Sequence, residues 1–189
     1  MKHLAVFASG SGSNYEAIEN AFLDSNKEGC CVSLLVSDSP NAFVLERAKK
    51  FNRETFVFNP KNYENKEKYE KDILDRLIKH DIDLICLAGY MRIIGDTLLE
   101  AYQGRIINIH PALLPSFKGK NGIEDAFDYG VKVFGVTIHY VSKEVDGGKI
   151  IAQRAIEYYG NSLQELETYI HEIEHELYPE TIKKLIKGN

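Results

Sequence analysis

Short apolar runs alternate with amphipathic segments along most of the chain. Runs rich in Val, Ile, Leu and Phe have the length of buried or half-buried strands, and they cover residues 4–8, 32–36, 56–58, 84–88, 105–109, 135–141 and 149–156. Apolar side chains recur at helical spacing at Ala17, Ile18 and Phe22, over residues 42–51 and 66–80, and in a final stripe over residues 163–177. Pro179 is expected to kink or restart this last helix.

The order of these elements predicts the fold class. Strands that alternate with helices in the first half favour an α/β fold, with a Rossmann-like, mostly parallel open sheet and helices on both faces. The last three predicted strands lie close together, so we expect an antiparallel portion near the C-terminal half. Neither a repeat nor a proline-rich linker interrupts residues 1–189, which are therefore expected to form a single domain.

The composition fits a globular protein and narrows the classes of partner. Of the 189 residues, 44% are hydrophobic and 27% are charged, and the net charge is -5. This balance argues against a nucleic acid partner, because phosphate binding needs clustered Lys and Arg. A cytoplasmic location without membrane association is expected, since no apolar stretch approaches the roughly 20 residues of a membrane span and the N-terminal segment is unlike a signal peptide. Cys30, Cys31 and Cys86 lack the spacing of a metal or redox site.

A glycine-rich turn follows the first predicted strand. Gly10 and Gly12 stand in Ser-Gly-Ser-Gly-Ser-Asn before the first predicted helix, where backbone amides and the helix dipole favour an anion. The turn lacks the Gly-Lys-Ser/Thr of a P-loop, and Tyr15 stands where a dinucleotide-binding motif has its third glycine. A terminal phosphate of a small substrate is therefore the favoured ligand. An ordinary tight turn is one alternative, and a nucleotide-binding oxidoreductase in which Asp38 holds a ribose is another.

Two polar side chains share one face of the strand predicted near residues 105–109. The two-residue period of a strand puts Asn108 and His110 on the same side, and Pro111 ends the strand directly after them. An amide that donates to a developing oxyanion, beside an imidazole that carries a proton, suits acyl transfer. A hydrogen-bonded core histidine next to a turn asparagine is the alternative.

Asp146 lies in a Val-Asp-Gly-Gly turn between the last two predicted strands. A carboxylate near a histidine favours the charged imidazolium. The spacing along the chain does not show that Asp146 meets His110, and a role in the turn alone is the simpler interpretation of these residues by themselves.

The strand residues also carry a resemblance to a known family. The segment Asn108-Ile109-His110-Pro111-Ala112-Leu113-Leu114-Pro115 is similar to the folate-dependent formyltransferases, whose hallmark is an Asn, His and Asp constellation in this order. The glycine-rich turn, Ala88-Gly89-Tyr90-Met91-Arg92-Ile93, the Val-Asp-Gly-Gly turn and Glu174-His175-Glu176-Leu177-Tyr178-Pro179 extend the resemblance over nearly the whole chain.

The resemblance implies an activity and its partners. The formyl group of 10-formyltetrahydrofolate would be transferred to the amine of glycinamide ribonucleotide, giving N-formylglycinamide ribonucleotide and tetrahydrofolate in de novo purine biosynthesis. The enzyme would act as a monomer or homodimer and without a metal. A formyltetrahydrofolate deformylase, a hydrolase that shares the catalytic residues, is the alternative within the family.

The resemblance also implies a role for each candidate residue. Asn108 and His110 would stabilise the oxyanion, and Asp146 would keep His110 charged, while the substrate amine itself attacks. Contacts to the ribonucleotide are implied for Gly12, Ser13, Asn14 and Glu174, and contacts to folate for Lys66, Met91, Arg92, Ile93, Ile94 and Asn108. Glu174 flanks the apolar stripe of its predicted helix, so its carboxylate is expected to point into the protein.

Three lysines depart from the family pattern. Lys66 stands where a folate-contacting Arg is common, Lys118 replaces a proline before Gly119, and Lys149 replaces a proline after the Asp-Gly turn. These changes bear on loop geometry and affinity rather than on the class of reaction.

The last predicted helix contains a competing motif. His171-Glu172-Ile173-Glu174-His175 matches the HExxH signature of zinc proteases. On the helical wheel both histidines lie away from the apolar stripe, so they are expected to face solvent rather than a buried metal. A zinc protease is therefore a remote alternative, and a solvated helix face is the simpler interpretation.

Overall fold

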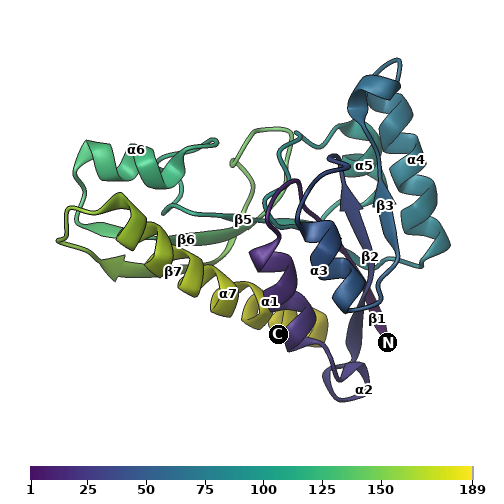
Figure 1. Ribbon diagram of the computed structural model, residues 1–189, viewed down its shortest axis with the longest axis horizontal. Helices are drawn as coiled ribbons and strands as arrows, with labels where there is room; N and C mark the ends of the chain where they lie inside the picture. The colour runs from purple at the N-terminus through teal and green to yellow at the C-terminus, as the bar shows by residue number, and fades with distance from the viewer. Residues whose placement is uncertain (189) are drawn as a thin grey trace.

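The computed structural model of the chain describes residues 1–188, and within them seven strands form one sheet (Figure 1). The order across the sheet is β3-β2-β1-β4-β5-β6-β7. The bounds are β1 (Lys2–Phe7), β2 (Cys30–Ser37), β3 (Thr55–Val57), β4 (Leu84–Leu87), β5 (Ile106–His110), β6 (Val133–Tyr140) and β7 (Ile150–Glu157). Neighbours from β3 to β5 are parallel, whereas β6 is antiparallel to both β5 and β7. The predicted strands and the mixed sheet are confirmed.

The predicted helices are present, and further ones join them. The predicted helices are α1 (Ser13–Ala21), α3 (Val44–Lys50), α4 (Lys66–Lys79) and α7 (Leu163–Lys187). The sequence pattern did not indicate α2 (Ser25–Glu28), α5 (Asp96–Ala101), α6 (Gly122–Tyr129) or the 3-10 turn η1 (Pro60–Asn62). Of these, α2, α5 and η1 are too short to show a clear period. Across residues 1–188, no helix combines the length and apolar character needed to cross a membrane.

Helix α7 continues through Pro179 in a single helix, so the expected restart is wrong. Tyr178 and Ile182 on either side are fully buried, and the Tyr178 hydroxyl donates to the Leu87 carbonyl at 2.9 Å. Packing of this turn against the sheet therefore offsets the backbone hydrogen bond that proline cannot make.

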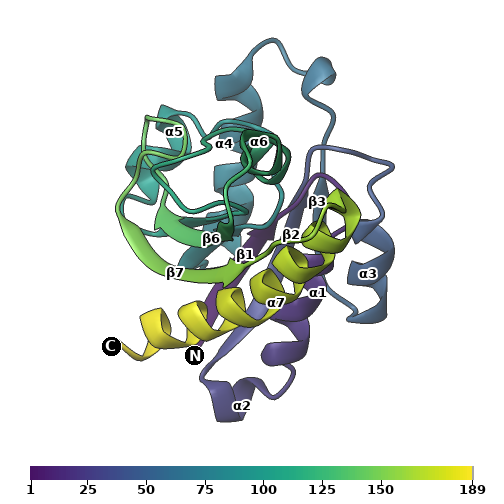
Figure 2. The ribbon, with the colours of Figure 1, turned by 90° about the vertical axis from the view of Figure 1, so that its left-hand side faces the viewer.

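Helices cover both faces of the sheet (Figure 2). On one face α1 and α7 lie side by side and α3 packs beside α1. On the other face α4 and α5 pack against the parallel strands. Successive residues of β1 enter opposite cores, since Val6 joins the cluster under α1 and α7 whereas Phe7 joins the cluster under α4.

The strand order reverses at β1, which lies between β2 and β4. In an open parallel sheet a crevice forms at the carboxyl ends of the strands where the order reverses. The glycine-rich turn after β1, the segment after β4 and the end of β5 all reach this edge, so the fold brings the three candidate regions together.

Candidate active site

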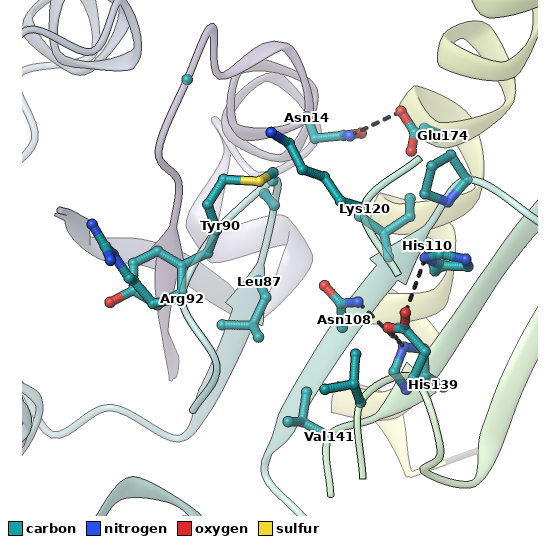
Figure 3. Close-up of a pocket in the computed structure, with 18 of the residues that line it drawn as sticks. Asn14, Leu87, Tyr90, Arg92, Asn108, His110, Lys120, His139, Val141 and Glu174 are labelled. Atoms are coloured by element: carbon teal, nitrogen blue, oxygen red, sulfur yellow. Dashed lines mark hydrogen bonds and ion pairs between the residues drawn. The ribbon is translucent and has the colours of Figure 1, made fainter. Parts of the chain in front are cut away.

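A cavity of about 600 Å³ lies at this edge of the sheet (Figure 3). Its volume is in the range of small-molecule sites. Eleven of the twelve predicted site residues line it, and these are Gly12, Ser13, Asn14, Met91, Arg92, Ile93, Ile94, Asn108, His110, Asp146 and Glu174. Lys66 is not in the lining; its ammonium lies 3.9 Å from the Glu70 carboxylate, and its contact with folate stays a prediction.

The polar pair of β5 is held by the neighbouring strands, Asn108 from both sides and His110 by Thr137 of β6. Asn108 is in register with Leu87 of β4 and with His139 of β6. Asn108 and His110 both line the cavity, as the two-residue strand period predicts. Because His110 is only 3% exposed, its ring has a fixed setting within the sheet.

Both ring nitrogens of His110 face oxygen atoms. Nε2 lies 2.7 Å from the Phe117 carbonyl oxygen, which only accepts, so this nitrogen carries a hydrogen. Nδ1 lies 3.5 Å from Oδ2 of Asp146. The doubly protonated imidazolium satisfies both oxygens. Donation of the Nε2 hydrogen to another acceptor requires the Phe117 carbonyl to withdraw.

Asp146 is both a turn residue and part of the site. Its φ of 50° is in the left-handed region, which Asp tolerates better than most residues. The turn places its carboxylate, which is 10% exposed, between His110 and His139. The Gly119 amide donates to Oδ2 at 2.8 Å. Burial alone would raise the pKa of Asp146, but the hydrogen bond from the Gly119 amide and the nearby His110 ring hold this pKa below its ordinary value.

The sequence reasoning missed His139, the second histidine at this carboxylate. Its Nδ1 donates to the Tyr140 carbonyl at 2.9 Å, so Nε2 is free to accept from the Asn108 amide nitrogen at 3.2 Å. Nε2 also lies 3.5 Å from Oδ1 of Asp146. His139 therefore orients the Asn108 amide. The alternation of Thr137 and His139 on β6 was the available signal, since it is the same period that identified Asn108 and His110.

The opposite end of the cavity is built from the glycine-rich turn and α7. Gly12 has a φ of 75° and lies so close to Val44 that a Cβ would collide with that side chain. No side chain caps the start of α1 within the described residues, so amides of its first turn are available to an anion. The Asn14 amide nitrogen donates to Glu174 at 3.2 Å, and Glu174 is 4% exposed, as its helical position predicted.

The two histidines of the HExxH motif have different environments. His171 is half exposed, lines the cavity and donates from Nδ1 to Glu174 at 2.8 Å. The expectation that His175 faces solvent is wrong, because its Nε2 is buried and the ring stacks on His171. Nδ1 of His171 is hydrogen bonded to Glu174. Residues 1–188 contain no group of three or more His, Cys, Asp or Glu side chains arranged to hold a metal ion.

The segment after β4 forms an apolar wall. Met91 and Ile93 are more than half exposed, whereas Ile94 is buried. Arg92 donates from Nε to Asp38 at 2.7 Å. Asp38 is the residue that would hold a ribose if the protein were a nucleotide-binding oxidoreductase. In the structure its carboxylate is instead paired with Arg92.

Lys118 joins two loops beside the Asp146 carboxylate. Its ammonium lies 2.7 Å from Glu144, two residues before Asp146. Lys118 thus links the loop that contains Gly119 to the turn that contains Asp146. Lys149, another departure from the family pattern, is exposed just before β7.

Comparison with known proteins gives consistent matches. A family model described as formyl transferase matches residues 2–182. The chain is 52% identical over 190 residues to phosphoribosylglycinamide formyltransferase of Bacillus subtilis, with 100% of this chain and 97% of the relative covered. Among solved structures, phosphoribosylglycinamide formyltransferase from Bacillus halodurans is 49% identical with a TM-score of 0.91, covering 98% of this chain and 95% of that one. Glycinamide ribonucleotide transformylase 1 from Geobacillus kaustophilus is 51% identical with a TM-score of 0.91, covering 98% of each chain.

Proposed function

Because the chain belongs to the formyl transferase family, we infer that it transfers a formyl group to the amine of phosphoribosylglycinamide, the glycinamide ribonucleotide of purine biosynthesis. We propose 10-formyltetrahydrofolate as the donor, with tetrahydrofolate as the second product. The observation that carries the proposal is the meeting of Asn108, His110 and Asp146 in one cavity, with an anion-favouring turn at one end and an apolar wall at the other.

The two ends of the cavity suit different parts of the reacting molecules. The free amides at the start of α1 suit the ribonucleotide phosphate, and the buried carboxylate of Glu174 suits hydroxyl groups of the ribose as an acceptor. The exposed Met91 and Ile93 suit the flat pterin ring of the folate. Glycinamide nitrogen and formyl carbon then meet beside Asn108.

Each polar residue has a distinct role in the proposed reaction. The amine forms a bond to the formyl carbon, the bond from that carbon to N10 of the folate breaks, and one proton passes from the amine to N10. Asn108, with one amide hydrogen held by His139, donates the other to the formyl oxygen as negative charge develops there. His110 carries the proton, and Asp146 stabilises its charged form.

We further propose a cytoplasmic enzyme in which residues 1–189 form one formyltransferase domain. Every residue assigned a role comes from the same chain, so the site is complete in a monomer and equally in each half of a homodimer. Small molecules alone are the proposed partners.

Mixing the protein with glycinamide ribonucleotide and 10-formyltetrahydrofolate tests the function directly. We expect tetrahydrofolate to be released in a one-to-one ratio with N-formylglycinamide ribonucleotide, and both products to be absent without the ribonucleotide. Release of formate from 10-formyltetrahydrofolate and water alone would instead identify a deformylase. Nicotinamide binding, or zinc-dependent peptide cleavage, would contradict the proposal outright.

A further inference from the structure

The apolar wall has no regular secondary structure of its own. Between the end of β4 and the start of α5 the chain passes through residues 88–95 without a strand or helix. Backbone hydrogen bonds hold only its first residues, where the Ala88 amide donates to the Phe7 carbonyl at 2.8 Å and the Ser9 amide donates to the Gly89 carbonyl at 3.1 Å. Side chains from distant elements hold the backbone of residues 91–95. Ser9 accepts from the Met91 amide at 2.9 Å, and Glu70 accepts from the Gly95 amide at 2.6 Å. The wall is therefore fixed near both of its ends by side-chain oxygens.

Glu70 is the more deeply buried of these anchors. It projects from α4, does not line the cavity and is 2% exposed. Burial raises the pKa of its carboxyl group, and the Gly95 amide, Lys66 and the Leu98 amide offset part of that rise. A buried carboxylate is costly unless it is hydrogen bonded, so these contacts account for its place in the core.

The contact between α4 and the wall leaves no free space. A Cβ at Gly95 would lie 2.7 Å from Oε2 of Glu70 and 2.8 Å from Cε of Lys66. The residue just before, Ile94, is buried in the same core cluster as Tyr69 and Ile73 of α4. Any shift of the Glu70 carboxylate therefore acts directly on the backbone that carries Ile94.

We propose that Glu70 is a positioning residue for the folate-binding wall, which it fixes through Gly95 without touching the cosubstrate. The proposal rests on the proposed function, because it takes residues 91–94 as the folate wall. Glu70 then sets the affinity for the cosubstrate through the backbone of the wall. Ribonucleotide binding, at the α1 and α7 end of the cavity, is independent of it.

Glu70→Gln tests this role by replacing one carboxylate oxygen with an amide donor. Glu67→Gln is the matched control. It makes the same charge change on the same helix, but Glu67 pairs with Lys71 at the surface. Equilibrium binding of tetrahydrofolate and of glycinamide ribonucleotide is measured separately for each variant by calorimetry. We expect Glu70→Gln to weaken folate binding about tenfold and to change ribonucleotide binding less than about twofold.

Gly95→Ala approaches the same contact from the other side. Its backbone, with a φ of -96°, accommodates alanine, so the added methyl group acts through its collision with Glu70. This variant is expected to weaken folate binding selectively as well, and it carries the test if Glu70→Gln does not fold. A purely structural role would lower the fraction of active protein without changing either dissociation constant.

The outcomes separate this inference from the proposed function. If the wild-type protein binds tetrahydrofolate, and the folded Glu70→Gln or Gly95→Ala protein binds it with the same affinity, the positioning role alone is overturned. Equal weakening for both ligands also overturns it. Failure of the wild-type protein to bind tetrahydrofolate overturns the proposed function and the positioning role together.

Discussion

The wall that carries Asn108 and His110 and the wall formed by residues 91–94 face the same cavity, but different contacts fix their backbones. The proposed catalytic wall lies on β5, where Asn108 pairs with β4 on one side and with β6 on the other, and His110 pairs with Thr137 of β6. The proposed folate wall, residues 91–94, is irregular, and Ser9 and Glu70 hold it from other elements. One wall depends on the sheet and the other on a few side chains.

This difference predicts different consequences of substitution. On the catalytic wall a side chain can be removed while the backbone stays in place, so chemistry is lost and binding is kept. On the folate wall the loss of an anchor moves the backbone, so cosubstrate binding weakens and the chemical step is spared. Kinetic constants distinguish the two, because the first appears in kcat and the second in KM for folate.

His110→Ala is expected to have the largest effect. Loss of the proton carrier should lower kcat by about 10²- to 10⁴-fold, while KM for each substrate changes less than about threefold. Asp146→Asn should reproduce most of this loss, because it removes the negative charge beside both histidines and keeps the shape of the side chain. Steady-state release of tetrahydrofolate measures both variants.

His80→Ala is a suitable control for these substitutions, since His80 lies at the end of α4 and does not line the cavity. It should retain wild-type kcat. Thermal unfolding of all three variants checks that the fold is kept. A rise in KM for folate as large as the fall in kcat would contradict the separation of the two walls.

His139→Leu is expected to have the next largest effect, with kcat lowered about 10- to 100-fold. The leucine cannot accept from the Asn108 amide, so that amide loses its fixed orientation towards the formyl oxygen. His139→Gln retains an acceptor at a similar reach and should recover much of the loss. Equal kcat values in the two variants would show that His139 does not act through Asn108.

His139 also illustrates how far the sequence alone predicts this site. The strand period identified Asn108 and His110 as neighbours, and the same rule puts Thr137 and His139 on one face of the strand that pairs with them. Which strands lie side by side was the missing information. The pairing of Asn108 with His139 is a property of the sheet order, and the hydrophobic pattern does not encode that order directly.

The anchors of the folate wall were harder to predict from sequence. Glu70 and Gly95 are 25 residues apart, and neither belongs to a motif that indicates contact. The pattern around Glu70 is that of an ordinary amphipathic helix, and helix α5 is too short to show a period. Likewise Asp146 is a plain turn residue until the turn is placed against His110 in three dimensions. The strands and four of the helices were predictable, and the contacts between distant elements were not.

Ser9→Ala should have a smaller effect on the folate wall. It removes one neutral hydrogen bond to the Met91 amide, so KM for folate is expected to rise about twofold to fivefold with kcat unchanged. Ser33→Ala, which removes a hydroxyl of β2 remote from the cavity, is the control measured under the same conditions. A change in kcat without a change in KM would place Ser9 with the catalytic wall instead.

The smallest effect is expected at the pair of His171 and Glu174, where a regular helix already fixes both side chains. The hydrogen bond to Glu174 raises the pKa of His171, while partial burial opposes that rise. Because the pKa is higher in the folded protein than the ordinary value of about 6.5, the stabilisation is fully present below that pH and is lost as the pH rises through the folded pKa. The melting temperature of wild type should exceed that of His171→Gln by about 1 °C or less at pH 5.5, and the difference should vanish at high pH, since His171 is half exposed. In a Glu174→Gln background the pH dependence should disappear. A difference in melting temperature that grows with pH would contradict the predicted direction. A difference of several degrees would show that a regular helix depends on its side-chain contacts as much as the proposed folate wall does.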